Sequence, residues 1–350
     1  MDKIFDRDVR YDCLRILAAS MVVFLHVSAN AWYSLSPSDF NWKTMNFYDC
    51  LVRCAVPLFF MLSGAFLLKK EISIKKLYLA KILPLIVIYF VWSMLYAIDS
   101  IGIDNMTSIG IVDFVDEILN SHYHLWFIPV LIGTYVLQPI LHSFVNFKNG
   151  KYVIYYLICF FVLGILHPTI IEIFRSNQIV ITFLNKFSAE LFSYCGYIIL
   201  GYYLANMKNF KIRPIVAIIF YLITVIISAV FAQLVSVKNG KPISFLYGNF
   251  MLPVFIEAVL LFICFQNLNF KCYASERFKI FIFRVSTLTM GVYLLHPFVI
   301  KALETYFNLN TLSFLPMFSI PVIVVICFVV CLAVTFIMSK IPCIRLLWTF

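Results

Sequence analysis

Long apolar runs recur along the whole chain of 350 residues and limit the folds that are open to it. Each run has about 20 residues, which is the length that an α-helix needs to cross the hydrocarbon core of a bilayer. The composition agrees, because 63% of the residues are hydrophobic and only 13% are charged. A soluble domain needs about 25% charged residues to cover its surface. The sequence therefore predicts an integral membrane protein.

The apolar runs predict ten membrane-spanning helices, so the expected fold class is an all-α membrane bundle in one domain, 1–350. The first run is too long for a signal-peptide core and no small-residue cleavage site follows it, so we expect it to be retained. The tenth run ends shortly before the last residue, and we expect no C-terminal soluble domain. The ten expected spans are 12–32, 49–68, 77–98, 125–145, 152–173, 187–206, 214–235, 249–268, 286–306 and 317–338.

The basic residues are distributed unevenly between the connections that join these runs. Of the 27 Lys and Arg residues, 19 lie in the two terminal segments and in alternate connections, whereas the connection 99–123 has five acids and no base. Because basic residues accumulate on the cytoplasmic side of a membrane, both termini are predicted to be cytoplasmic. The net charge of +10 therefore reports topology and contact with anionic membrane lipids, and we expect no nucleic-acid partner.

The ten cysteines are scattered and lie mostly inside apolar runs. They form no CxxC pair and no Cys/His pattern with metal-ligand spacing, so we expect neither a metal site nor a bound cofactor. Small apolar membrane residues are the simpler interpretation.

The stretch YDCLRILAASMVVFLH, 11–26, has an aspartate, an arginine and a histidine in its apolar run. Eleven residues separate Arg15 from His26, which is three helical turns plus about 20°, so the two side chains share one face of a helix. They lie about 16 Å apart along the helix axis. With the N-terminus inside, Arg15 is near the cytoplasmic surface and His26 is in the outer half of the membrane.

Ionisable residues of other runs fall at a depth similar to that of His26. Arg53 is expected about 7 Å below the outer surface, Glu257 about 12 Å below it, and His296 near the middle of the membrane. A charge at the centre of a spanning helix costs about 2.5–3.5 kcal/mol, so such residues usually face a bundle interior and mark a functional path. These ionisable residues, together with His124 and Trp126 at the outer start of the fourth run, predict a polar chamber that is open to the outer side.

Each of these residues also has a structural explanation. Arg15 can extend its charge to the inner headgroups, and His26 can be a neutral histidine that is bonded to a neighbouring helix. Arg53 and Glu257 can form a structural ion pair.

The remaining three candidates have structural explanations of the same kind. His296 precedes Pro297 and can satisfy carbonyls that a proline kink leaves free. His124 and Trp126 can be ordinary interfacial residues.

Five segments, in order, resemble the acyltransferase-3 family of integral membrane acyltransferases. The resemblance covers about 300 of the 350 residues, and the most similar subgroup O-acetylates surface polysaccharides or their lipid-linked sugar units. The segments are DCLRILAASMVVFLH (12–26), RCAVPLFFMLSGAFLL (53–68), HLWFIPVLIGTYVLQPIL (124–141), YCGYIILGYYLA (194–205) and GVYLLHPFV (291–299).

The resemblance implies transfer of an acyl group, usually acetyl, from cytoplasmic acyl-CoA to a hydroxyl of a sugar acceptor that can be lipid-linked. It implies that His26 is the essential histidine, that Arg15 is its companion, and that Arg53 is the arginine of the second-helix motif. It also implies a bacterial cytoplasmic membrane as the location. Acetyl-CoA would then be a donor substrate.

A mechanism follows from these groups. Arg15, fixed by Asp12, would bind the phosphates of the donor. His26 would deprotonate the sugar hydroxyl or carry the acyl group itself, and the sequence leaves both routes open. Arg53 would stabilise the oxyanion.

The other candidates have supporting roles. Glu257 would orient or stabilise the imidazolium, and Trp126 would stack on a sugar ring. His124 and His296 complete the expected substrate-binding set.

Two other classes of function remain open at this point. A secondary transporter or an exporter of a lipid-linked sugar also needs buried charges and kinked helices. A membrane scaffold or sensor would need neither His26 nor acyl-CoA. Turnover of acyl-CoA that depends on His26 distinguishes the enzyme from both.

Overall fold

The computed structural model describes residues 8–102, 109–175, 177, 193–207, 210–269, 275–342 and 345–348. Every regular element in these ranges is a helix and none is a strand, which confirms the all-α fold class. Seven helices in the described ranges are long and apolar enough to cross a membrane. They are Val9–Ala29 (α2), Phe40–Leu67 (α3 and α4), Ile74–Ile101 (α5, η1 and α6), Val153–Ile173 (α10, η4 and α11), Pro214–Lys238 (α14), Glu276–Phe307 (α16) and Pro316–Met338 (α17).

The other three predicted spans are also helical, but they are bent or short. The fourth consists of α8 (Phe127–Val136) and α9 (Gln138–Asn146), and the axis bends by 54° at the break between them. Pro139 explains this bend, since proline cannot donate a helical hydrogen bond to the turn that precedes it. With this bent pair counted as one span, the described residues have up to eight spans rather than ten.

The sixth and eighth predicted spans are the short ones. In the eighth, α15 (Leu252–Gln266) has only 15 residues, because Pro253 lies at its start and irregular chain precedes it. In the sixth, the described helix consists of α13 (Ser193–Tyr202) and η5 (Tyr203–Met207), and the first residues of the prediction, 187–192, lie outside the described residues.

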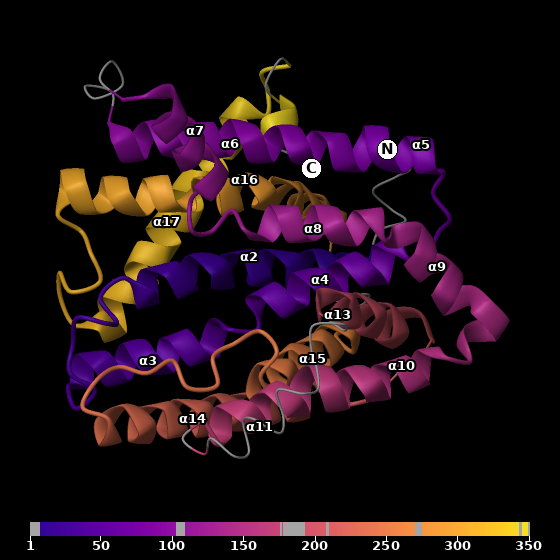
Figure 1. Cartoon of the computed structure of the whole chain (residues 1–350), viewed down its shortest axis with the longest axis horizontal. Coiled ribbons are helices and arrows are strands. Elements are labelled where there is room, and N and C mark those ends of the chain that lie inside the picture. The colour runs from indigo at the N-terminus through magenta and orange to yellow at the C-terminus, as the bar shows by residue number, and fades with distance from the viewer. Residues whose placement is uncertain are drawn as a thin grey trace.

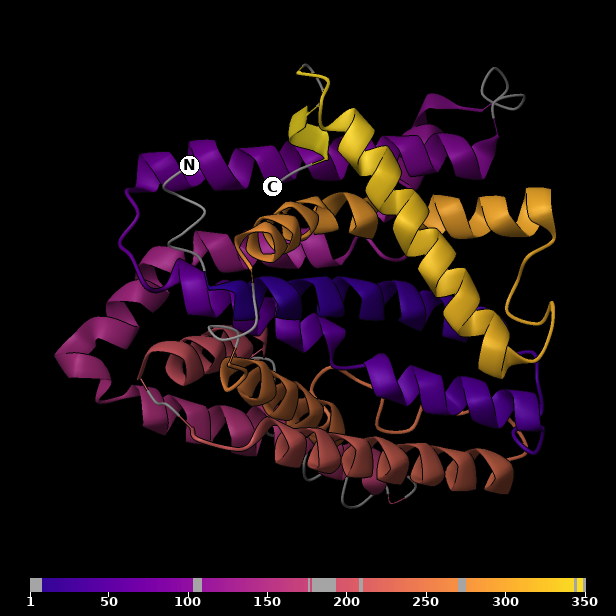
Figure 2. The same ribbon diagram turned by 180° about the vertical axis from the view of Figure 1, so that it is seen from behind.

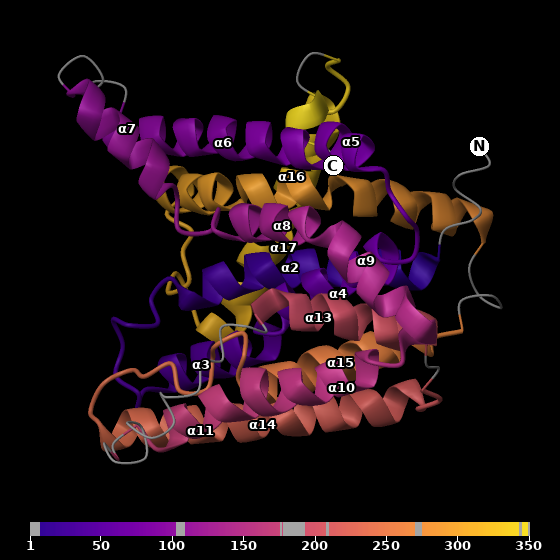
Figure 3. The same cartoon turned by 45° about the vertical axis from the view of Figure 1, so that its right-hand side comes forward.

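The helices run side by side and their connections alternate between the two ends of the bundle (Figure 1). α2 lies in the middle and packs against α3, α4, α15, α16 and α17. The yellow α17 crosses obliquely over this side of the bundle in Figure 2. In Figure 3, α5 and α9 lie towards one end, and α7 (Ile111–Asn120), which follows α6, lies at the other. This alternation is the arrangement that the uneven distribution of basic residues requires.

Several shorter elements complete these helices. Inside the long spans, α5 is Ile74–Leu77, η1 is Tyr78–Ile82, α6 is Leu83–Ile101, α10 is Val153–Cys159, η4 is Phe160–Leu166 and α11 is His167–Ile173. The turns η3 (Phe147–Gly150) and η6 (Arg345–Leu347) lie outside them.

The second span is interrupted beside the site. α3 (Phe40–Val52) ends just before Arg53, and α4 (Ala55–Leu67) begins after Cys54. Pro57 lacks the N–H that would bond the carbonyl of Arg53, so one helical hydrogen bond is missing at this point and the helix is weakened here. The break places Arg53 between two helices.

α4 and α13 pack closely because glycines face each other's backbone. A Cβ atom on Gly64 would overlap the backbone carbonyl of Ile198, and a Cβ atom on Gly201 would overlap that of Met61. Small residues allow this close approach of membrane helices.

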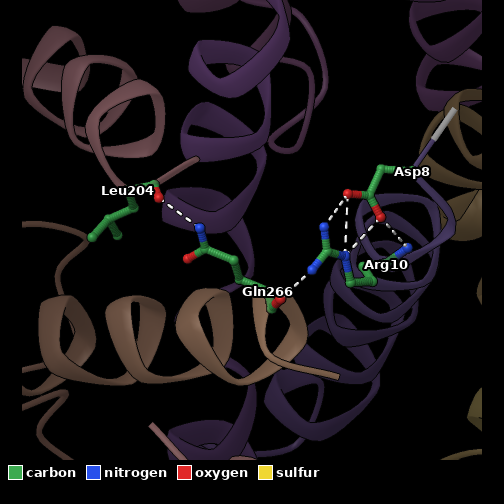
Figure 4. A network of polar contacts seen from close by, with 4 residues as sticks. All are labelled: Asp8, Arg10, Leu204 and Gln266. Atoms are coloured by element: carbon green, nitrogen blue, oxygen red, sulfur yellow. Dashed lines mark hydrogen bonds and ion pairs between the residues drawn. The ribbon is translucent and has the colours of Figure 1, made fainter. Parts of the chain in front are cut away.

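A polar network fastens the start of α2 to the ends of two other helices (Figure 4). Asp8 caps α2, accepts a hydrogen bond from the backbone N–H of Arg10 and pairs with its guanidinium. Arg10 also donates to the backbone carbonyl of Gln266 at the end of α15, and the side-chain amide of Gln266 donates to the carbonyl of Leu204 in η5 over 2.7 Å. The network therefore fixes the position of the helix that has Arg15 and His26.

Candidate functional site

A cavity of about 590 Å³ lies between α2, α4, α8 and α16, in the middle of the bundle. Both Arg15 and His26 line it, as their spacing on one helix face predicts. Arg53, His124 and Trp126 line the same cavity. The structure thus brings five of the eight predicted site residues to one cavity. Because they come from different positions on the helices, they lie at different points along the cavity.

The end of the cavity near Arg15 is more polar than the sequence analysis predicts. Lys81 of η1 lines it, and so do Ser286 and Thr287 of α16. From the sequence, Lys81 was interpreted only as one of the basic residues that indicate topology. Its position at the start of an apolar span was the available signal, but only packing shows that it lines the cavity.

His26 lines the cavity and packs against two other rings. Its ring centroid is 5.0 Å from that of His296, with the planes 24° apart, and 5.0 Å from that of Tyr123, in an edge-on contact. In the described part of the chain, neither ring nitrogen of His26 has a hydrogen-bond partner. The imidazole is therefore open to a substrate hydroxyl or a thioester.

Arg53 is held by a buried carboxylate next to the cavity. Its Nε and Nη2 atoms donate to Oδ2 of Asp49 over 2.8 and 2.5 Å, and its guanidinium lies 4.6 Å from the ring centroid of Tyr247. The structural alternative that pairs Arg53 with Glu257 is wrong, because the ion pair is with Asp49. The four-residue spacing, which places two side chains on one helix face, was the signal for this pair.

Glu257 is 1% exposed in α15 and is not among the residues that line the cavity. Its Oε2 atom is buried and has no hydrogen-bond partner among the described residues. The structure therefore does not bring Glu257 to the cavity wall, where orienting the imidazole of His26 would require it.

Asp12 is buried, and its Oδ1 atom accepts a hydrogen bond from Oγ of Ser286 over 2.7 Å. This contact joins α2 to α16 one helical turn from Arg15. The sequence predicts that Asp12 fixes Arg15, whereas Ser286 was not predicted as a partner of Asp12.

The segment before α8 places two histidines next to the cavity. Nδ1 of His122 lies 2.7 Å from Nδ1 of His124, and the ring of His122 stacks on that of Tyr96 with centroids 4.2 Å apart. Burial lowers the pKa of His122, nearby Asp99 opposes this effect, and Lys301 adds to it. Sequence reasoning missed His122, although the pattern HYH placed it beside His124.

Trp126 is 41% exposed and borders the cavity, with its ring centroid 5.9 Å from that of Tyr194. The side-chain amide of Asn249, another lining residue, donates to the hydroxyl of Tyr194 over 2.8 Å. An exposed indole beside a fixed amide is a surface on which a sugar ring can stack and bond.

His296 is fully buried and does not line the cavity. Its Nδ1 atom donates to the carbonyl of Tyr293 over 2.7 Å. Pro297, four residues after Tyr293, cannot donate to that carbonyl, so the structural explanation given for His296 is confirmed.

Replacing Asp49 by asparagine is expected to lower the free energy of unfolding by about 1–3 kcal/mol, because Arg53 loses its charged hydrogen-bond acceptor. The matched control is Asp99→Asn, since the Asp99–Lys301 ion pair is largely exposed and such pairs contribute about 0–1 kcal/mol. Chemical unfolding of both variants in detergent measures the difference. Equal effects of the two substitutions would contradict this account of Arg53.

The arrangement supports acyl-transfer chemistry. One end of the cavity has cationic groups that can bind phosphates, and the other has an imidazole beside a guanidinium. Within the described ranges, no group of three or more His, Cys, Asp or Glu side chains is arranged to hold a metal ion.

The comparison with known protein families agrees with this chemistry. A family model described as an acyltransferase domain matches residues 8–340. The chain is 26% identical over 315 residues to a protein of Enterococcus faecalis that is named an amino-acid racemase. The match covers 83% of this chain and 40% of that relative, so the chain spans less than half of the relative's length. No solved structure matches the chain.

Proposed function

Because the chain belongs to the acyltransferase-3 family and is a multi-pass membrane acyltransferase, we propose that it O-acetylates a surface polysaccharide or a lipid-linked sugar. In this proposal the donor is cytoplasmic acetyl-CoA, the acceptor is a sugar hydroxyl, and the protein resides in a bacterial cytoplasmic membrane. The acceptor can reach the site from the outer side.

The observation that carries this proposal is the single cavity that both Arg15 and His26 line. The two residues are eleven positions apart on one helix, so the cavity extends over about 16 Å along α2. Coenzyme A is polyanionic at one end and has its thioester at the end of a long flexible arm. Such a donor suits a cavity with cations at one end and an imidazole further along.

The donor end supplies the charge that phosphates need. Arg15 presents a planar guanidinium, and Lys81 adds a second cation in the same cavity. At the other end, Trp126 offers a stacking surface for the acceptor sugar.

Transfer would then proceed around His26. The imidazole takes the proton of the sugar hydroxyl while the oxygen attacks the thioester carbonyl, and Arg53 stabilises the oxyanion that forms. The C–S bond breaks, and the proton passes from His26 to the sulfur of coenzyme A. In a two-step route, His26 carries the acetyl group before the acceptor takes it.

Arg15→Ala is expected to raise KM for acetyl-CoA about 10- to 100-fold with a smaller effect on kcat, because charged hydrogen bonds to the donor are lost. The matched control is Lys151→Ala, which removes an exposed cation that does not line the cavity. Initial rates over a series of acetyl-CoA concentrations test this. An unchanged KM would remove Arg15 from donor binding.

The proposed acceptor class is tested with the purified protein in detergent, acetyl-CoA labelled in its acetyl group, and an extract of lipid-linked sugars. We expect label in the lipid-linked fraction, from which mild base should release it because an O-acetyl ester is labile to base. Label in a base-stable amide, or acetyl-CoA turnover without labelled glycan, would contradict the proposed acceptor. Absence of any turnover would contradict the proposed donor.

A further inference from the structure

His296 lies directly behind His26, on the far side of the ring that lines the cavity. Its side chain is 0% exposed, and the two imidazoles are stacked with centroids 5.0 Å apart and planes 24° apart. The ring of His124 packs edge-on against the ring of His296, with a centroid distance of 5.2 Å. His296 can therefore act on a substrate only through its neighbours.

The proline kink in α16 fixes the tautomer of His296. Pro297 has no N–H, so the carbonyl of Tyr293 lacks its helical donor, and Nδ1 of His296 takes that place over 2.7 Å. A carbonyl can only accept a hydrogen bond, so Nδ1 must carry the proton. Nε2 of the neutral ring is then unprotonated.

This Nε2 atom is buried and has no hydrogen-bond partner in the part of the chain that the structure describes. An unsatisfied buried acceptor is unfavourable, and one in a native structure calls for an explanation. The kink alone does not explain why this position has a ring with an unsatisfied nitrogen, because an asparagine side chain could also donate to the carbonyl of Tyr293. The lone pair of Nε2 lies in the plane of the ring, so the stacked ring of His26 does not satisfy it, but His26 covers the face of the His296 ring at 5.0 Å.

We propose that His296 is a positioning residue for acyl transfer, which holds the ring of His26 and stabilises its imidazolium form while it carries the acceptor proton. This rests on the proposed function, in which His26 takes that proton from the hydroxyl and returns it to the sulfur of coenzyme A. The face of a neutral aromatic ring attracts a cation at this separation. His296 itself neither gains nor loses a proton.

Two substitutions separate the two contacts of His296. His296→Asn keeps an amide N–H near the position of Nδ1, so the carbonyl of Tyr293 stays satisfied while the stacked ring and Nε2 are lost. Pro297→Ala keeps the ring but restores a backbone N–H, which competes for that carbonyl and releases His296 from its fixed orientation.

A matched control exists in α17. Pro321 also lies inside a helix, and the carbonyl of Met317, four residues earlier, accepts a hydrogen bond from the hydroxyl of Tyr48 over 2.9 Å. Pro321→Ala therefore makes the same change in backbone and displaces a side-chain donor in the same way. Tyr48 does not line the cavity.

The experiment measures acetyl-CoA turnover and thermal unfolding of the purified full chain in detergent. We expect His296→Asn and Pro297→Ala to lower kcat roughly 10- to 100-fold, with KM for acetyl-CoA unchanged and the melting temperature of Pro297→Ala not below wild type. Pro321→Ala should turn over at the wild-type rate. In a background of His26→Ala, neither substitution should reduce the residual rate further, because it acts through His26.

Wild-type turnover in both variants would overturn the role of His296 and leave the proposed function intact. A slower His296→Asn that also unfolds at lower temperature, together with wild-type turnover in Pro297→Ala, would overturn it as well. Absence of acetyl transfer in the wild-type protein would instead overturn the proposed function.

Discussion

Replacing His26 by alanine is expected to lower acetyl-CoA turnover by about 10²- to 10⁴-fold, which is the usual contribution of a positioned general base. The ring lines the cavity, and in the described part of the chain its nitrogens bond no other residue, so its removal breaks no hydrogen bond within the protein. We therefore expect a small change in thermal stability. Release of free coenzyme A from the purified variant measures the rate.

The matched control for this substitution is His142→Ala. His142 lies in α9, outside the cavity, and its Nδ1 atom bonds the carbonyl of Leu68 over 2.9 Å. We expect this variant to turn over at close to the wild-type rate. Equal rates for His26→Ala and the wild type would exclude His26 from the chemistry and would leave the mechanism without a base.

Replacing Gly64 by valine is expected to produce the largest loss of stability among single substitutions in the bundle. Even a Cβ atom at this position would overlap the backbone carbonyl of Ile198, and a backbone cannot move aside as a side chain can. Overpacking against side chains typically costs about 1–3 kcal/mol, and we expect a larger cost here because α4 and α13 must separate. The melting temperature of the purified protein in detergent measures this effect.

Two further variants make this result interpretable. Gly201→Val tests the same interface from α13, where a Cβ atom would overlap the carbonyl of Met61. Gly133→Ala in α8 is the control, because nothing lies within 4 Å of a Cβ atom at that position. A melting temperature for Gly64→Val equal to that of Gly133→Ala would contradict the close packing of α4 on α13.

Hydropathy predicted where the helices lie, because burial in lipid requires apolar side chains along a whole span. It did not predict the shape of those helices. The 54° bend in the fourth span depends on Pro139, and the break beside Arg53 depends on Pro57. A count of apolar residues detects neither the bend nor the break, since a proline changes hydrogen bonding rather than hydropathy.

The face of one helix was predictable, whereas contacts between helices were not. The spacing of Arg15 and His26 was sufficient to place both on the cavity wall. Depth arguments placed Glu257 at a similar level, but depth does not determine which way a helix is rotated, and Glu257 does not line the cavity. Lys81 was missed for the same reason, because its rotation follows from packing.

Local hydrogen-bonding rules gave reliable predictions where they applied. Pro297 predicts a free carbonyl at Tyr293, and His296 bonds it. The same kind of rule would have found Asp49 as the partner of Arg53, since the two are four residues apart.

The most direct test of the account places donor and acceptor on opposite sides of a membrane. The protein is reconstituted in proteoliposomes of known orientation, with acetyl-CoA on the Arg15 side and a membrane-impermeable glycan acceptor on the Trp126 side. We predict acetylated glycan in this arrangement, none when the two compartments are exchanged, and none with His26→Ala. Transfer only when both substrates are on the same side would contradict a cavity that links a cytoplasmic donor to an outer acceptor.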